Sequence, residues 1–453
     1  MIDRFPYGKA PFWLLVLALT STFVVVFLRH RVSAERADLT MALFAPNHLP
    51  AYRRVVPVFE RKHNIRIALQ LVQQRALQTR LQNAMLSGTQ VPDLVELPEG
   101  ALSFFTRGPL SDVGFLDLTE RLEREGLRSR LVESRLSLWT SRGHIFALPH
   151  DVHPVMLMYR ADLVEQLGID VNTLTTWDEF AAVGRRIVKD LDGDGVPDRY
   201  MIDFPATANW GITLLLRQRG VNLFDAEGKV VFNNPKTVDT IVWYLRQSFG
   251  KDRIAYECGF GQPLIKAMRD GLVLFYFAPD WRTFLVEQEA PKLAGKMKLM
   301  PLPAWEPGGR RTSVWGGSGL AITRNSPRRE LAWEFAKLLY FDKAELGHRF
   351  LFSNIIPPLR DAWNLPEFRR KNPFYANQEI GALYAAMAPE TPPSWSSAYY
   401  MTAEGKLNEG FLRAAQYFKT QGDVGLHELV QRELDIAERY LNTVMARNVL
   451  ARR

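Results

Sequence analysis

Between residues 39 and 97, segments whose apolar residues are spaced as in a helix take turns with short apolar segments typical of strands. Residues 51–63 and 77–86 carry apolar side chains at helical spacing. Short apolar runs between them predict strands at residues 39–44, 65–72 and 92–97. Because strands and helices alternate along the chain, we predict an α/β fold with a parallel sheet and right-handed crossovers.

Two polar residues follow strands of this predicted sheet. Asn47 comes after the first strand, and Glu99 comes after the third. Ligands of open α/β sheets bind beyond the carboxyl ends of the strands. Both residues are therefore candidates for ligand contact.

A similar mixture of strands and helices continues to about residue 341. Predicted strands are residues 145–149, 155–159, 272–277 and 298–302, and predicted helices are residues 213–219, 235–249 and 264–270. Thr176 and Glu179 form a capping-box pattern that predicts the start of a further helix. Beyond Phe341 the pattern is mostly helical, with proline-rich interruptions. We expect a second α/β region followed by helices.

An uncharged, apolar stretch covers residues 10–28. As a helix it would extend about 28 Å, close to the roughly 30 Å hydrocarbon core of a bilayer. Val32-Ser33-Ala34 offers a signal cleavage site, but Arg29-His30-Arg31 lies between this site and the apolar core. We expect residues 1–34 to act as an uncleaved membrane anchor, with a cleaved signal or a buried soluble helix as alternatives. No cysteine directly follows the apolar stretch, which excludes a lipoprotein anchor.

Composition limits the possible partners. The chain has 453 residues, of which 47% are hydrophobic, enough for two or three domains. Its net charge is +8, but no cluster of basic residues interleaves with aromatic residues, so we expect no nucleic-acid partner. The single cysteine, Cys258, excludes an internal disulfide and a cysteine-based metal site.

A glycine-rich turn at residues 316–319 leads into a short apolar strand and then an amphipathic helix from Glu330. Five further segments precede it: Gly88 with 92–95, 147–149 with 158–163, 176–180, 243–245, and 270–271 with 279–281. In this order they resemble family 1 extracellular solute-binding proteins, the maltose-binding-like receptors of ABC importers, over about residues 39–445. Arg160 replaces the family's usual asparagine, and Asp280 interrupts its usual Gly-Pro-Trp. These two departures leave the identity of the ligand undecided.

The resemblance implies a two-lobed periplasmic binding protein fold of the class II type, whose lobes close on a ligand like a hinge. Lobe 1 would contain residues 39–148 and 304–342, and lobe 2 would contain residues 149–303 and 343–453. Strands crossing between the lobes would lie near Pro149 and Leu302, with a third crossing at residues 341–343. The resemblance also implies an extracytoplasmic location and ABC permease subunits as partners.

A carbohydrate ligand needs aromatic side chains for its C–H faces and polar groups for its hydroxyls. Trp281 occupies the position where the family places a stacking tryptophan, so the resemblance assigns it to ligand binding. The other aromatic candidates lie in predicted loops and are Trp210, Trp315, Trp395 and Tyr399. Core packing is the alternative for each of them.

Further polar candidates follow the first predicted crossing. Asp151 and His153 should point into the cleft, although His150 and His153 could instead form a metal pair. No third metal ligand is identifiable nearby in the sequence. Gly316 and Gly317 could let backbone amides approach a ligand closely, or could simply form a turn.

An acidic loop at residues 190–198 matches the first nine positions of an EF-hand calcium loop. The candidate ligands are Asp190, Asp192, Asp194, Val196 and Asp198. Met201 stands where that loop needs its glutamate, and Asp203 is a possible substitute. A structural calcium ion and a solvated polar turn are the two interpretations.

Taken with the resemblance, these patterns favour a receptor that delivers a carbohydrate, in the first place an oligosaccharide, to an ABC permease. A membrane-tethered sensor with the same fold and a carbohydrate-active enzyme are the alternatives. Leu320 breaks a nucleophile-elbow pattern, and P-loop, GxGxxG and HExxH motifs are absent from the sequence. We therefore expect no catalysis and no required cofactor.

Overall fold

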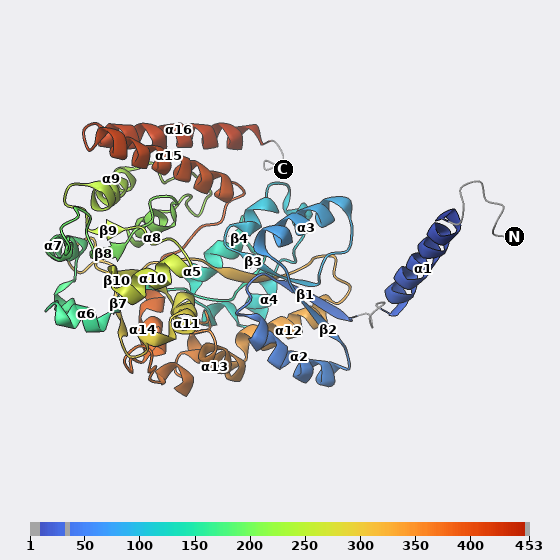
Figure 1. Cartoon of the computed structure of the whole chain (residues 1–453). Helices are drawn as coiled ribbons and strands as arrows, with labels where there is room; N and C mark the ends of the chain where they lie inside the picture. Colours follow the sequence, from blue (N-terminus) through green and yellow to red (C-terminus); the bar gives the residue numbers. More distant parts are fainter. Residues whose placement is uncertain (1–9, 32–36, 449–453) are drawn as a thin grey trace.

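The computed structural model describes residues 10–31 and 37–448 of the chain (Figure 1). Helix α1 (Ala10–Arg31) comes first. Within the described residues, no helix is both long and apolar enough to cross a membrane. The anchor predicted over residues 10–28 is therefore not supported, and the predicted cleavage site at Val32-Ser33-Ala34 lies outside the described residues.

A five-stranded sheet with the order β2-β1-β3-β12-β6 forms the first lobe. Its strands are β1 (Leu39–Leu43), β2 (Ile67–Leu71), β3 (Leu94–Pro98), β6 (Leu148–Pro149) and β12 (Ser318–Ile322). β1 pairs in parallel with β2 and β3, whereas β12 runs antiparallel to β3 and β6. The alternation of strands and helices in the sequence therefore gives the expected parallel pairing of β1, β2 and β3. β12, which follows much later in the chain, is antiparallel to its neighbours.

Helices cover the faces of this sheet. The remaining elements of the lobe are α2 (Leu49–His63), α3 (Gln74–Ser87), α4 (Thr119–Arg124), α5 (Glu133–Leu136), β4 (Thr140–Ser141), β5 (His144–Ile145) and α12 (Arg329–Phe341). α2 and α3 end at Asn64 and Gly88, both in left-handed backbone conformation, which terminates each helix and turns the chain toward the next strand.

A second five-stranded sheet, with the order β11-β7-β10-β8-β9, forms the other lobe. Its strands are β7 (Val155–Arg160), β8 (Tyr200–Asp203), β9 (Ala255–Tyr256), β10 (Val273–Pro279) and β11 (Met297–Pro301). Its helices are α6 (Ala161–Gln166), α7 (Trp177–Ile187), α8 (Trp210–Gln218), α9 (Pro235–Phe249), α10 (Gln262–Asp270) and α11 (Asp280–Glu289). The capping box at the start of α7 is confirmed, because Thr176 and Glu179 each bond the other's backbone N–H.

Two segments in the described part of the chain connect the two sheets. Residues 150–154 join β6 to β7, and residues 302–317 lead from β11 back to β12, whereas after α12 the chain continues into the C-terminal helices. The predicted crossing strand near Leu302 is wrong, since β11 pairs with β7 inside the second sheet. Residues 302–312 also stay with the second lobe, because Ala304 N–H donates to the carbonyl of Thr175, just before α7. The division into lobes given from the sequence stays a prediction.

The C-terminal part is helical, with α13 (Lys343–Leu351), α14 (Ile380–Met387), α15 (Tyr400–Gln421) and α16 (Leu426–Arg447). α15 and α16 lie side by side over α9 of the second lobe (Figure 1). α13 instead contacts α2 and α12 of the first lobe. One continuous apolar core contains residues of both sheets, such as Leu43 and Met156, so the lobes are joined by packing as well as by the connecting segments.

Candidate ligand-binding cleft

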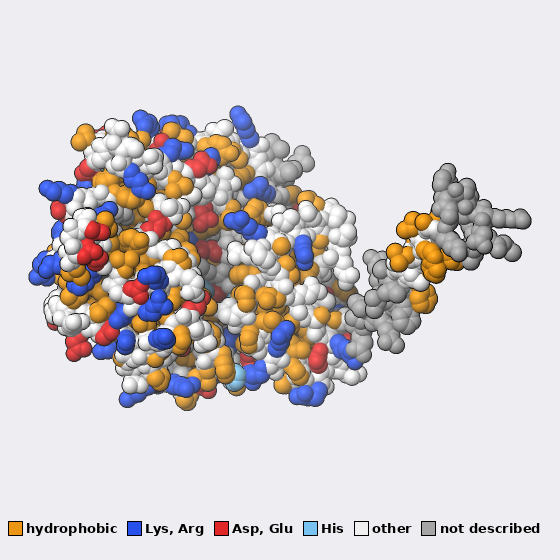
Figure 2. Space-filling view, viewed as in Figure 1, with side chains coloured by type: hydrophobic (Ala, Val, Ile, Leu, Met, Phe, Trp, Pro, Cys, Tyr) orange, Lys and Arg blue, Asp and Glu red, His pale blue; other side chains and the backbone are white. Residues whose placement is uncertain are grey.

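A cleft of about 550 Å³ lies between the two lobes. Figure 2 shows the surface hollowed there, with acidic side chains in the recess. The first lobe contributes the carboxyl ends of β1 and β3, and the second contributes α8 and the start of α11. Eight residues singled out from the sequence line the cleft: Asn47, Glu99, His153, Trp210, Trp281, Trp315, Gly316 and Gly317.

Three tryptophans form one wall of this cleft. The rings of Trp210 and Trp315 stack with centroids 4.2 Å apart and 7° between their planes. Trp281 meets Trp315 edge to face at 5.4 Å, and its indole N–H donates to the Trp315 carbonyl at 3.2 Å. All three side chains are half-buried, so part of each indole remains accessible. Trp210 begins α8, so the loop predicted for it is wrong.

A buried cation supports the tryptophan wall. The Arg282 guanidinium carbon lies 5.4 Å from the centroid of the Trp315 ring and 6.0 Å from that of Trp210. Phe260, which is 55% exposed, packs 5.4 Å from Trp210 and extends the apolar wall to the surface. Cation–π attraction and ring packing hold the indoles in place before any ligand arrives.

Charged groups from both lobes meet in the cleft. Arg217 Nη2, on α8, lies 2.5 Å from Glu99 Oε1, which follows β3, and the Tyr400 hydroxyl donates to the same oxygen at 3.1 Å. Burial would raise the pKa of Glu99, but the Arg217 charge outweighs this effect and lowers it. Burial and the Glu99 charge raise the pKa of Glu404, which lines the same cleft. This group offers both donors and acceptors to a polar ligand.

A buried ion network lies behind the cleft at the first connecting segment. His153, at φ +54°, places Nδ1 2.6 Å from Asp280 Oδ1 and Nε2 3.0 Å from Asp151 Oδ2. Burial alone would lower the pKa of His153, but the charges of Asp151 and Asp280 raise it to about 9. Backbone N–H groups of Ser318 and Ile356 donate to these two carboxylates at 2.9 Å and 2.7 Å. The network therefore links the first connecting segment to the start of α11, the start of β12 and the segment after α13.

Asp151 does not point into the cleft as the sequence led us to expect. It is fully buried, and the charge of His153 keeps its pKa well below the usual range although burial opposes this. The metal pair considered for His150 and His153 does not form either, because both rings face the same oxygen, Asp151 Oδ2, at 3.2 Å and 3.0 Å.

The two candidate glycines serve different purposes. Gly316 has φ +90°, and a Cβ there would lie 3.5 Å from the His153 ring and 3.6 Å from Trp281 Nε1. At Gly317 a Cβ would lie 2.7 Å from Arg135 Nη2 and from Leu138 Cδ2, so a larger residue there would have to displace the ends of these two buried side chains. Only at Gly316 does the backbone conformation itself favour glycine.

Trp395 and Tyr399 lie outside the cleft. Tyr399 is buried in the core of the second lobe, and Trp395 lines a separate, smaller pocket. Sequence reasoning missed Arg217 and Glu404. Arg217 stands in the run Leu214-Leu215-Leu216-Arg217, and a charge inside an apolar helical run was the signal that could have identified it.

The acidic loop lies far out on the second lobe and is exposed. One carboxylate oxygen from each of Asp190, Asp192 and Asp194 lies within 4.8 Å of the others, an arrangement that could hold a cation. Hydrogen bonds from the Gly195 and Gly193 N–H groups lower the pKa of Asp190. Asp203 is not a further ligand, because it is buried in β8 and accepts a hydrogen bond from Cys258 N–H.

A second, larger hollow of about 1140 Å³ lies on the surface of the first lobe, beside Asp38, Gly88 and Arg324. Its described lining contains no aromatic side chain. The interlobe cleft is therefore the better candidate for a ligand with apolar faces, because it combines tryptophans, charged groups and a boundary between the two lobes.

Comparisons with known proteins agree with this architecture. The chain is 26% identical over 371 residues to an arabinooligosaccharide-binding protein of Bacillus subtilis (strain 168), covering 80% of this chain and 83% of the relative. The sugar-binding protein MalE of Xanthomonas citri is 17% identical with a TM-score of 0.71, covering 90% and 99% of the two chains. An ABC transporter associated binding protein of B. animalis subsp. lactis Bl-04, solved with beta-1,6-galactobiose, is 18% identical with a TM-score of 0.67, covering 89% and 98%.

The two solved structures establish the two-lobed fold. The family described as bacterial extracellular solute-binding protein matches residues 45–345, which include the second sheet, every strand of the first sheet except β1, and most of the cleft. This chain belongs to the family of bacterial extracellular solute-binding proteins.

Proposed function

We propose that this protein captures an oligosaccharide in the interlobe cleft and delivers it to the permease of an ABC transporter. The observation that carries the proposal is the tryptophan wall of Trp210, Trp281 and Trp315 facing the same cleft as Glu99 and Arg217. Indole faces match the C–H faces of a pyranose or furanose ring, and the charged groups match its hydroxyls.

The names of the relatives direct the choice of ligand. Relatives from two organisms are arabinooligosaccharide-binding proteins, so arabinooligosaccharides are the first ligands to test. A third relative is a lactose-binding protein, and one solved structure contains maltotetraose, which makes galactosides and maltodextrins the matched comparison ligands.

Ligand capture would use the contacts that already span the cleft. The pair Glu99–Arg217 joins the lobes, and hydroxyls inserted between the two groups can replace their mutual contact with charge-assisted hydrogen bonds. The ion network of Asp151, His153 and Asp280 lies at the connecting segments, where hinge motion between the lobes would be absorbed.

Isothermal titration calorimetry of the purified protein tests the proposal. Arabinobiose, arabinotriose and longer arabinooligosaccharides are titrated beside lactose, maltotetraose and the free monosaccharides. We expect saturable binding by at least one oligosaccharide series and much weaker binding by its monosaccharide. Failure of every oligosaccharide, with saturable binding of an amino acid or peptide instead, would overturn the proposal.

Two accessory features predicted from the sequence, a calcium site and a membrane anchor, remain proposals. We propose that Asp190, Asp192, Asp194, Val196 and Asp198 hold a structural calcium ion, since uncompensated carboxylates this close together repel one another. The family indicates an extracytoplasmic location. Attachment to the membrane through residues 10–28 is tested by carbonate extraction of membranes, where release of the intact chain counts against it.

A further inference from the structure

Glu404 brings an unpaired carboxylate to the wall of the cleft. It stands four residues after Tyr400 on α15, so the two side chains share one face of the helix. From this face the Tyr400 hydroxyl bonds Glu99, and Glu404 lines the cleft beside them. In the described part of the chain, the Glu404 carboxylate forms no hydrogen bond or ion pair, and only its backbone carbonyl accepts a bond from a side chain, Asn209 Nδ2 at 3.4 Å.

The positive charge nearest to this carboxylate is already engaged. Arg217 is the only lysine or arginine among the described residues that line the cleft. Its Nη2 atom lies 2.5 Å from Glu99 Oε1 and also donates to the Tyr400 hydroxyl. Because Glu99 and Arg217 cancel each other's charge, Glu404 leaves this part of the cleft with one excess negative charge.

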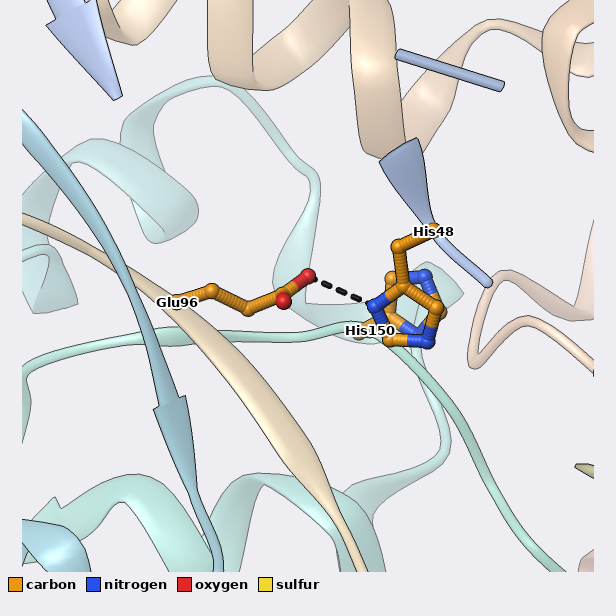
Figure 3. Close-up of side chains that lie close together, drawn as sticks. All are labelled: His48, Glu96 and His150. Carbon is orange, nitrogen blue, oxygen red and sulfur yellow. Dashed lines mark hydrogen bonds and ion pairs between the residues drawn. The ribbon is translucent and has the colours of Figure 1, made fainter. Parts of the chain in front are cut away.

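The two histidines of the lining do not supply the missing positive charge. His153 uses both ring nitrogens to contact carboxylates, Nε2 at Asp151 and Nδ1 at Asp280. His48 points Nδ1 at Oε1 of the buried Glu96, 2.8 Å away (Figure 3). Each histidine therefore faces at least as many carboxylates as it could carry charges.

Two buried arginines behind the lining are also matched by carboxylates. Arg135 Nη2 lies 3.5 Å from Asp151 Oδ1. Burial lowers the pKa of Arg282, and the nearby charge of Asp203 opposes this effect. With His153 and its second carboxylate, this layer holds three cations and three carboxylates, so it adds no net charge to the cleft.

The surroundings of Glu404 already disfavour negative charge. Burial and then the charge of Glu99 raise the pKa of Glu404, although Arg217 opposes them. A sugar hydroxyl can donate a charge-assisted hydrogen bond to this carboxylate. A carboxylate on the ligand would instead place a like charge beside it, and like charges brought together in a binding site weaken binding strongly.

We propose that Glu404 makes the cleft selective for uncharged oligosaccharides and against chains that carry uronic acids or other anionic groups. This inference rests on the proposed function, because it takes an oligosaccharide as the ligand. Glu404 acts through its charge, and the Glu99–Arg217 pair acts by leaving no free cation to receive an anion.

Calorimetry on the full chain compares ligands that differ by one charge. Arabinotriose, galactobiose and maltotetraose are each titrated beside derivatives oxidised to a carboxylate at one end or the other, and beside the matching carboxamides, which have the same size and no charge. We expect at least one of the two carboxylates to bind about 30-fold more weakly than its carboxamide. Carboxylates that bind as tightly as their carboxamides at both ends overturn the inference alone. If no oligosaccharide of any kind binds, the proposed function fails with it.

Substitutions assign the selectivity to Glu404. Glu404→Gln keeps the size of the side chain and removes its charge, so the ratio of carboxamide to carboxylate affinity should fall about tenfold. Glu409→Gln is the matched control, because Glu409 is exposed on the same helix and pairs with Lys406, and it should leave the ratio unchanged. Glu99→Gln releases Arg217 and should shift the preference toward the carboxylate. A folded Glu404→Gln variant with the wild-type ratio, or a Glu99→Gln variant that rejects the carboxylate as strongly as the wild type, contradicts the inference.

Discussion

Trp281→Ala is the substitution that separates ligand binding from packing in the cleft. Trp281 is half-buried in the first turn of α11, where it contacts the edge of Trp315 and donates to its carbonyl. Removing the indole takes away an apolar surface available to a sugar face and also frees the Trp315 ring. We expect the binding free energy of the cognate oligosaccharide to weaken by about 1–3 kcal/mol, which is roughly 5- to 150-fold in Kd.

The stability cost of this change should be smaller than for a core tryptophan. A fully buried tryptophan costs about 3–5 kcal/mol when truncated to alanine, and Trp281 remains partly exposed. Trp305→Ala is the matched control, since Trp305 is also half-buried and packs 5.0 Å from Trp243 in the second lobe, away from the cleft lining. It should lower the melting temperature and leave the affinity unchanged.

Calorimetry and thermal unfolding are run on both variants and on Trp281→Phe. Phenylalanine keeps an aromatic face but loses the hydrogen bond to the Trp315 carbonyl, so it should restore most of the affinity. If Trp281→Ala binds the oligosaccharide as tightly as the wild type while its melting temperature falls as far as that of Trp305→Ala, Trp281 is a packing residue and the assignment of the wall is wrong.

Three further outcomes are expected. Because the pKa of His153 is raised to about 9, its ion pairs stabilise the fold fully below about pH 6.5, the value for a free histidine, and this stability is lost as pH rises through 9. His153→Gln should therefore flatten the dependence of the unfolding free energy on pH between about 6.5 and 9, measured by denaturant unfolding. An unchanged pH dependence in this variant would contradict a charged His153. Asp192→Asn with Asp194→Asn should remove any rise in melting temperature between chelator and millimolar calcium, and a wild type without such a rise shows a solvated turn. Small-angle scattering should show a smaller radius of gyration on adding the bound oligosaccharide, whereas an unchanged profile at saturation argues against hinge closure.

The periodicity of the sequence predicted the parts of the fold that local physics determines. The pattern at residues 235–249 gave the bounds of α9, and the capping box at Thr176 gave the start of α7. Short apolar runs gave β1 and β3, and the strand-end rule then placed Asn47 and Glu99 at the cleft. In each case the interaction that forms the element joins residues close together in the sequence, or the position of the residue follows from the parallel order of the strands.

Features that depend on distant partners were missed or misplaced. β11 resembled a crossing strand because its apolar residues do not show which sheet they join, and only pairing with β7 decides that. Asp151 was expected in the cleft, but its direction depends on Ser318, 167 residues further along the chain, which no local pattern reveals. His48 and Glu96 gave no signal as a pair because 48 residues separate them in the chain.

The position of β12 in the first sheet has a consequence for biosynthesis. β12 lies between β3 and β6, yet about 170 residues separate β6 from β12 along the chain. At synthesis rates of about 5–20 residues per second, roughly 10–30 s pass before this strand can pair. Until then the inner edge of β3 has no neighbour, and the first lobe of the nascent chain cannot complete its core. The order of strands thus leaves the first sheet of a growing chain incomplete for as long as its second lobe is being made.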